Sequence, residues 1–276
     1  MILSRFFQSR RLLASVSLAV CLSILSVTIQ AQKTPNVEKL VEFAKANYGL
    51  LLAQTNGVIK SNLKLINGDQ VREGRSTLKF IRKPKLMEDL VILELDLPDT
   101  KFTMGFDGQK TWATNNGERT ELSPELSDAF RSSYAHSYEA LLRYKEDGSK
   151  LEYVDTKKIA SYEIDTLDLI MAEGTRTRYE VSRRSGRVLY LEYESKPTTP
   201  DAKPVKYRLH FKDFKFVQNN TVVIPYTTVV YENGVIVEER TVIEVAFSGQ
   251  LDEKIFKPDA PAEKVEEKKD PAPTKP

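Results

Sequence analysis

The sequence predicts a mainly β protein of the α+β class, in which a single curved antiparallel sheet has helices packed against it. Three observations predict this fold. Apolar and polar residues alternate along most of the chain after Gly57, as they do in half-buried strands. Turn dipeptides such as Asn-Gly and Asp-Gly separate the alternating runs. No obvious linker interrupts them, so we expect about ten or eleven strands in one domain.

A helix is expected at the start of this domain, near Val37–Asn47. The segment Thr34–Asn36 can cap and open it, and apolar residues then recur at helical spacing until Gly49. After Gly57 the period changes to two, which indicates a meander of strands. The first three strands are expected at Val58–Ile66, Arg75–Arg82 and Asp89–Leu97.

The next strands form a hairpin with the sequence KFTMGFDGQKTWATNNGER, residues 101–119. Its Asp-Gly and Asn-Gly dipeptides supply the positive φ values that tight hairpin turns need. Alternation places Phe102, Met104 and Phe106 on one face of the first strand, and Trp112 follows the turn. The hairpin therefore presents several large apolar side chains to whatever covers that face.

The strand before this hairpin has the same amphipathic pattern. Val91, Leu93 and Leu95 share one face, and Glu94 and Asp96 lie on the other. A sheet with one apolar and one polar face needs a cover over the apolar face. That face either packs as a filled core or lines a cavity, and the sequence leaves both interpretations open.

A second helix is expected after the hairpin. Ser123 and Pro124 are typical of a helix start, and an apolar stripe then runs from Leu126 to Leu142 in steps of three or four residues. Asp147-Gly148 ends this stretch. The strands expected after Lys150 include Asp165–Ala172, Arg176–Ser182, Val188–Glu194, Lys206–Val217, Val222–Tyr231 and Val235–Phe247.

The N-terminal segment 1–31 is typical of a cleaved export signal. Three arginines precede the uncharged apolar stretch Leu12–Ile29, and Ala31 stands where cleavage before Gln32 requires a small residue. An uncleaved membrane anchor is the alternative, because this stretch is almost long enough to cross a bilayer. Cys21 provides a second alternative, since LAVC partly resembles a lipoprotein attachment site.

The C-terminal segment 259–276 has a different composition. It is rich in proline, lysine and glutamate, and Val265 is its one large aliphatic residue. Such a segment cannot bury enough apolar surface to order itself, so we expect a disordered charged tail.

Sequence motifs for catalysis, metal binding or cofactor binding are absent. Cys21 is the only cysteine and lies in the predicted signal, which excludes disulfides and cysteine chemistry from a mature chain. The two histidines, His136 and His210, lie in no recognisable catalytic or metal signature, although Glu139 has helical spacing from His136. The 41 Lys and Arg residues nearly balance the 39 Asp and Glu residues, so a nucleic-acid-binding face is not indicated. We expect no enzyme, no metal, no cofactor and no nucleic-acid partner.

Two motifs made of turn and packing residues suggest a family. The first joins Phe106-Asp107-Gly108 to Thr111-Trp112, and the second is the ending GQLDEKIFKP, residues 249–258. With the order of elements, they make the chain from Thr34 to Pro258 resemble the LolA/LolB-like superfamily of periplasmic lipoprotein carriers. In that superfamily an incomplete β-barrel, with helices over its concave face, holds acyl chains in an apolar cavity.

The resemblance implies that residues 32–258 form a LolA-like lipid-binding domain. It implies a soluble, monomeric periplasmic carrier or chaperone that binds acyl chains of lipoproteins or lipids in outer-membrane biogenesis, without catalysis and with envelope proteins as possible partners. The helices Val37–Asn47 and Leu126–Leu142 would gate the cavity. The candidate lipid-binding residues are Val91, Leu93, Leu95, Phe102, Met104, Phe106 and Trp112.

The alternative function is an envelope interaction or stress-sensor module with the same fold. Related domains of that superfamily have such roles. In this case the concave face would be a packed core, and an edge strand or the tail would bind the partner. A hydrolase that uses surface carboxylates is a third class, but the sequence has no motif in its favour.

Overall fold

The computed structural model describes residues 35–146, 148–195, 203–247 and 249–257. In these residues thirteen strands form one antiparallel sheet. The strands are β1 (Asn56–Asn67), β2 (Gln70–Ile81), β3 (Leu90–Leu97), β4 (Thr100–Phe106), β5 (Thr111–Asn115), β6 (Glu118–Thr120), β7 (Lys150–Ile159), β8 (Tyr162–Ile170), β9 (Arg176–Ser182), β10 (Val188–Glu194), β11 (Lys206–Val217), β12 (Val222–Glu232) and β13 (Val235–Ala246). The predicted single antiparallel sheet is confirmed, with more strands than expected because short strands such as β6 have no readable alternation.

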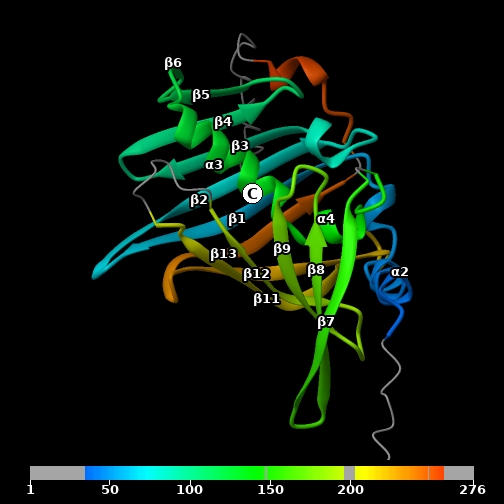
Figure 1. The fold of residues 1–276 in the computed structure, drawn as a ribbon. Coiled ribbons are helices and arrows are strands. Elements are labelled where there is room, and N and C mark those ends of the chain that lie inside the picture. The colour runs from blue at the N-terminus through cyan, green and yellow to red at the C-terminus, as the bar shows by residue number, and fades with distance from the viewer. Residues whose placement is uncertain (1–34, 147, 196–202, 248, 258–276) are drawn as a thin grey trace, which may run out of the picture. The chain divides into compact units, whose positions relative to one another are not determined.

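The sheet consists of two meanders joined through the first and last strands. Its order is β6-β5-β4-β3-β2-β1-β13-β12-β11-β10-β9-β8-β7, so β1 pairs with β13 and the strands β6 and β7 are the two edges. The sheet is curved but does not close (Figure 1). After β6 the chain must therefore travel from one edge to the other, and it does so across the concave face.

Two helices make this crossing, α3 (Pro124–Ala135) and α4 (Tyr138–Leu142). The expectation of one continuous helix from Leu126 to Leu142 is wrong. His136 leaves the helical region with φ −92° and ψ 64°, and Ser137 is extended. The Ser137 side chain then accepts a hydrogen bond from the Ala140 amide, which caps a new helix.

The helix α2 (Val37–Asn47) has the predicted bounds. The Asn36 side chain accepts from the Lys39 amide at 3.0 Å and thereby caps its N-terminus. Gly49 ends this region with φ +64°, and a Cβ there would lie 2.2 Å from the Thr221 carbonyl oxygen. Glycine thus allows the chain after α2 to approach β12 closely.

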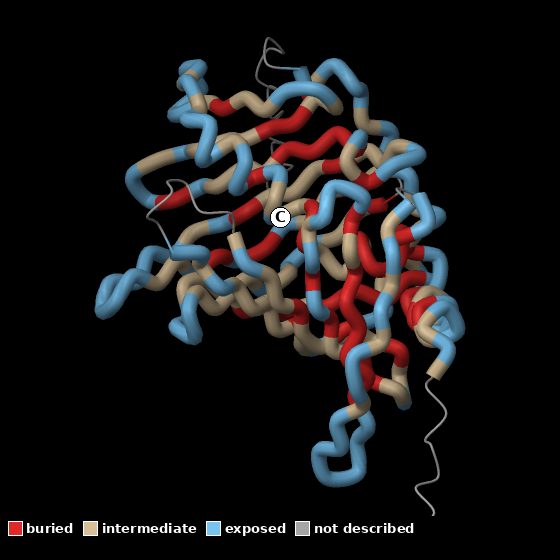
Figure 2. Tube along the Cα trace, viewed as in Figure 1, coloured by how far each residue is buried: buried red, intermediate tan, exposed pale blue. Residues whose placement is uncertain are grey.

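The main core lies between α2, α4 and the strands β8–β11, and further buried stretches run along β3–β5 (Figure 2). Val41 of α2 and Leu141 of α4 belong to a core with Leu167, Tyr179 and Leu191 of strands β8–β10. A second core continues it toward β1 and β12. The strands β1–β6, in contrast, are covered more sparsely on their concave face by α3.

A smaller apolar cluster lies on the outer face of the sheet. The short helix η3 (Glu253–Phe256) places the fully buried Phe256 against Leu90 and Ile92 of β3. The Trp112 indole N–H donates to the Phe256 carbonyl at 2.8 Å. The end of the described chain is therefore fixed to the back of strands β3–β5.

The predicted signal 1–31, the Cys21 attachment site and the predicted tail 259–276 lie outside the described residues. In the part that the structure describes, no helix is long and apolar enough to cross a membrane.

We predict that Gly105→Ala destabilises the domain. A Cβ at Gly105 would lie 2.2 Å from the Trp112 ring, which is fixed by η3. Overpacking of this kind costs about 1–3 kcal/mol. Urea unfolding measures the loss, with Thr103→Ala on the same face of β4 as the matched control. Equal free energies of unfolding for the two variants would contradict this account of the outer face.

Candidate functional site

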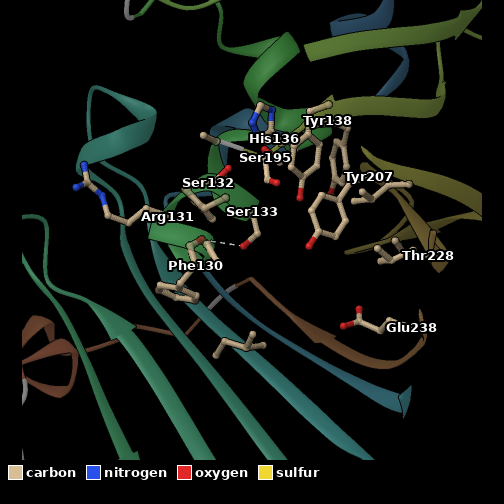
Figure 3. Close-up of a pocket in the computed structure, with 18 of the residues that line it drawn as sticks. Phe130, Arg131, Ser132, Ser133, His136, Tyr138, Ser195, Tyr207, Thr228 and Glu238 are labelled. Atoms are coloured by element: carbon tan, nitrogen blue, oxygen red, sulfur yellow. Dashed lines mark hydrogen bonds between the residues drawn. The ribbon is translucent and has the colours of Figure 1, made fainter. Parts of the chain in front are cut away.

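The concave face of the sheet is hollow beneath the crossing helices. A cavity of about 1940 Å³ lies between α3 and the strands β1–β3 and β11–β13. Drug-sized ligands fill pockets of roughly 300–1,000 Å³, so this space suits a larger ligand. Figure 3 shows α3 residues such as Phe130 and Ser133 on one side, with Tyr207, Thr228 and Glu238 across the space.

The sheet supplies most of the apolar wall. The lining side chains point inward because they alternate along neighbouring strands in register: Ile59 pairs with Leu78, and Leu78 with Leu93. The apolar residues that the sheet contributes include Ile59, Leu65, Leu78, Phe80, Val91, Leu93, Leu209, Phe211, Ile224, Val230 and Val242.

The structure brings six of the seven candidate residues to the concave face. Val91 and Leu93 line the cavity itself. Phe106 and Met104 pair with them across β3 and β4, and Phe106 packs against Phe130 of α3. Leu95 and Phe102 form the next pair on the same face, beyond the residues that line the cavity.

Trp112 does not lie with the other candidates. It pairs with Gly105, whose neighbours on β4 face the cavity side, so its indole lies on the outer face. There it packs against Leu90, Ile92 and Phe256. Its role in the structure is to hold η3 to the sheet.

Sequence reasoning missed most of the cavity wall, of which only Val91 and Leu93 were candidates. Leu209, Phe211, Val230 and Val242 come from β11–β13, which the β1–β13 pairing brings opposite β1–β3. The alternation in these strands was a readable signal of a concave face. The pairing of the first and last strands was not, because no local turn specifies it.

A buried ion pair fixes the crossing helices to the sheet. Asp89, before β3, is fully buried and receives hydrogen bonds from the Arg143 guanidinium, from the Tyr134 hydroxyl at 2.7 Å and from the Lys83 amide at 2.7 Å. Arg143 also donates to the Lys83 carbonyl at 2.7 Å. Tyr134 belongs to α3 and Arg143 follows α4, so one carboxylate holds both helices.

A second ion pair fixes α4. The Arg82 guanidinium donates to both carboxylate oxygens of Glu139 at 2.8 Å. Arg82 also donates to the Leu51 carbonyl at 2.8 Å, which joins α4, β2 and the segment after α2. Bidentate arginine pairs of this kind are directional as well as strong. By contrast, only Phe130 and Ala135 of α3 are buried.

His136 lies at the junction of α3 and α4. Its ring stacks on Tyr193 at 3.7 Å between centroids, and its Nδ1 lies 2.6 Å from the Thr177 hydroxyl. Tyr193 in turn stacks on Tyr207 at the cavity wall. Burial lowers the pKa of His136 from 6.5 to about 4, so the ring is neutral at pH 7.

The chemical character of the site is that of a container. The described residues include no group of three or more histidine, cysteine, aspartate or glutamate side chains that could hold a metal ion. The lining that β1–β3, β12 and β13 contribute is mostly apolar, with a few hydroxyl groups and one charged pair, Glu238 and Arg240, whereas α3, α4 and β9–β11 add further charged residues around it. This lining suits a ligand with a large apolar part.

We predict that His136 makes the free energy of unfolding depend on pH. An unfolded histidine binds its proton near pH 6.5, whereas folded His136 binds it only near pH 4. The unfolded state therefore binds more protons in this window, and stability falls as the pH falls through it. The loss from pH 7 to pH 5 is about 2 kcal/mol.

Urea unfolding of the wild type and of His136→Gln at both pH values measures this effect. The variant is expected to lose most of the pH dependence, whereas His210→Gln on the outer face should keep most of it. An unchanged pH dependence in His136→Gln would refute this role of the buried ring.

Comparison with known proteins agrees with this geometry. No protein-family model matches the chain, and no curated protein matches it in sequence. Solved structures do match. A LolA superfamily protein from Nitrosomonas europaea aligns with a TM-score of 0.56 at 12% identity, over 82% of this chain and 99% of that one.

Two further structures align equally well. A putative outer membrane lipoprotein-sorting protein domain from Vibrio parahaemolyticus gives a TM-score of 0.55 at 15% identity, over 80% of this chain and 97% of that one. A DUF1329 family protein from Desulfovibrio piger gives 0.54 at 12% identity, over 80% and 97%. The chain therefore has the fold of LolA-superfamily and lipoprotein-sorting domain structures, as the resemblance in its sequence predicted.

Proposed function

We propose that this protein is a soluble periplasmic carrier that holds the acyl chains of lipoproteins or lipids in its concave cavity, without catalysing a reaction. The observation that carries the proposal is the cavity of about 1940 Å³ between α3 and the sheet. The fold shared with a lipoprotein-sorting domain supports the same class of function.

The physical chemistry of acyl transport favours such a cavity. Each methylene transferred from water to an apolar wall contributes about 0.8 kcal/mol, so a chain of many methylenes needs a long apolar surface and few polar partners. Leu78, Leu93 and Val230 provide that surface from three different strands. Met87, also in the lining, is flexible enough to adapt to chains of different shape.

The entry route in this proposal lies beside α3. The helix α4 is fixed by Arg82 and Arg143, whereas α3 buries few residues and exposes Leu126. An opening movement of α3 breaks fewer contacts than one of α2 or α4. The gate is therefore the part of α3 ahead of Tyr134, which itself is bonded to Asp89, rather than the whole segment Leu126–Leu142, and α2, which contributes no lining residue, is not part of it.

The alternative, an interaction module with a packed core, uses the same fold differently. Such a module has no need of a large hollow on its concave face. No feature of the described residues specifically favours it, so the carrier remains the function that the geometry supports best.

We predict saturable binding of a fluorescent fatty acyl probe by the purified protein. Leu93→Trp, which fills part of the cavity, is expected to weaken this binding at least about tenfold, because lost apolar contact of about 1.4 kcal/mol already has that effect. Thr241→Trp adds the same ring to an exposed position on the outer face of β13 and is the matched control.

Probe fluorescence titration gives both dissociation constants. Failure of the wild type to bind any acyl probe would refute the carrier proposal. Equal loss in the two tryptophan variants would show that the probe binds elsewhere.

A further inference from the structure

Glu238 and Arg240 form a charged pair on the part of the cavity wall that β1–β3, β12 and β13 provide, where the other lining residues are uncharged; the remaining charged lining residues belong to α3, α4, the β8–β9 turn and β9–β11. Glu238 and Arg240 lie two residues apart on β13 and so face the same side of the sheet. The Arg240 Nε lies 2.7 Å from Glu238 Oε1, and Nη2 donates to Oε2 at 3.0 Å. The Arg240 side chain is 35% exposed and the Glu238 side chain 18% exposed, and both line the cavity.

Both side chains of this pair have hydrogen-bonding groups that no partner in the described part of the chain uses. A guanidinium has five N–H donors, and within the described residues every polar contact of Arg240 is with Glu238. The second terminal nitrogen, Nη1, thus has no protein acceptor there. The Glu238 carboxylate can likewise accept more hydrogen bonds than Arg240 gives it.

Hydroxyl and aromatic groups surround the pair. Thr228 of β12 is the direct strand neighbour of Arg240, and Ser61 lies on the adjoining strand β1. Tyr207 extends into the same space (Figure 3). Its ring stacks on Tyr193 with 5.1 Å between centroids, which forms an aromatic wall beside Glu238.

The electrostatics agree with this proximity. Burial raises the pKa of the Tyr193 phenol, and the negative charge of Glu238 raises it further. The carboxylate therefore acts on the aromatic wall, and because His136 and Tyr207 already stack on Tyr193, a cation bound there would meet Glu238 and the remaining face of Tyr207. Ammonium groups bind favourably to such combinations.

We propose that this polar floor recognises a zwitterionic phosphoethanolamine headgroup, so that the amphiphile in the cavity is a phospholipid of the ethanolamine type. Arg240 would bind the phosphate, with help from the hydroxyls of Thr228 and Ser61. Glu238 would accept hydrogen bonds from the ammonium group against the aromatic wall. The inference rests on the proposed function, because the acyl chains must occupy the apolar part of the cavity.

Charge balance selects a zwitterion over an ion of one sign. A purely anionic headgroup would meet Arg240 but would be repelled by Glu238, and a purely cationic one would face the reverse problem. A zwitterion exchanges one ion pair for two and leaves no buried charge alone. A primary ammonium can also donate hydrogen bonds to the carboxylate, whereas a choline group cannot.

The test compares four short-chain lipids that carry identical acyl groups. These are phosphatidylethanolamine, phosphatidylcholine, phosphatidylglycerol and diacylglycerol, with free phosphoethanolamine as a fifth ligand. Calorimetric titration of the wild-type protein is expected to give phosphatidylethanolamine an affinity about tenfold above that of diacylglycerol, since charge-assisted hydrogen bonds contribute on this scale. Free phosphoethanolamine is expected to bind far more weakly, because it lacks the acyl chains.

Two variants separate the charges. Arg240→Gln is expected to bind phosphatidylethanolamine no better than diacylglycerol. Glu238→Gln leaves Arg240 without its partner and is expected to shift the preference to the anionic phosphatidylglycerol. The control is Glu244→Gln. A bulge between Val242 and Glu244 turns Glu244 to the opposite face of β13, where it pairs with Lys60 at 2.9 Å. It should leave every ratio unchanged.

The outcomes separate the two proposals. Equal binding of all four lipids, or a Glu238→Gln variant with unchanged preference, overturns the headgroup site and leaves the carrier function standing. A wild-type preference for phosphatidylglycerol or phosphatidylcholine also overturns it. Absence of binding for every lipid, diacylglycerol included, overturns the carrier function itself. If Arg240→Gln does not fold, the Glu238→Gln result decides alone.

Discussion

The structure depends on one constraint, which is that the sheet, with thirteen strands in the described residues, bends without closing. Its edges, β6 and β7, remain apart, so the chain between them must cross the concave face. A crossing segment that packed fully onto the sheet would make a core, and one held off it makes a container. The buried Asp89–Arg143 pair helps to determine the spacing, because it fixes the ends of α3 and α4 to the start of β3.

This ion pair is costly to break. The Asp89 carboxylate is completely buried, and loss of its guanidinium partner would leave a charge without solvent or counter-charge, at a cost of roughly 3–5 kcal/mol. A second ion pair joins Glu139, one helical turn before Arg143, to Arg82 after β2, with the positions of the two charges exchanged. The helices are thus held over the hollow by buried ion pairs at their junctions, and their apolar stripe faces the sheet. The domain can therefore be stable without a ligand that fills the cavity.

Local patterns predicted much of this architecture. The helix α2, the strands β1–β3 and the shared face of Val91, Leu93, Met104 and Phe106 all follow from periodicity and turn chemistry. Trp112 was misplaced because the face after a turn depends on the pairing register. Phe106 pairs with Thr111, so Trp112 falls opposite Gly105 and points outward. The break at His136 was missed because the apolar stripe continues through it, and a cap at Ser137 becomes decisive only in the folded chain. The far wall of the cavity depends on the long-range β1–β13 pairing, which no local pattern specifies.

An open sheet, a crossing segment fixed by ion pairs and a hollow with an apolar sheet wall that carries the Glu238–Arg240 pair make up the site. We propose above all that this hollow holds an amphiphile. Native mass spectrometry of the protein purified from its own cells, followed by lipid extraction, tests this most directly. We predict a mass above that of the chain, with the excess lost on denaturation and recovered as an acylated species. A clean mass of the chain alone, together with no uptake of added lipid, would contradict it.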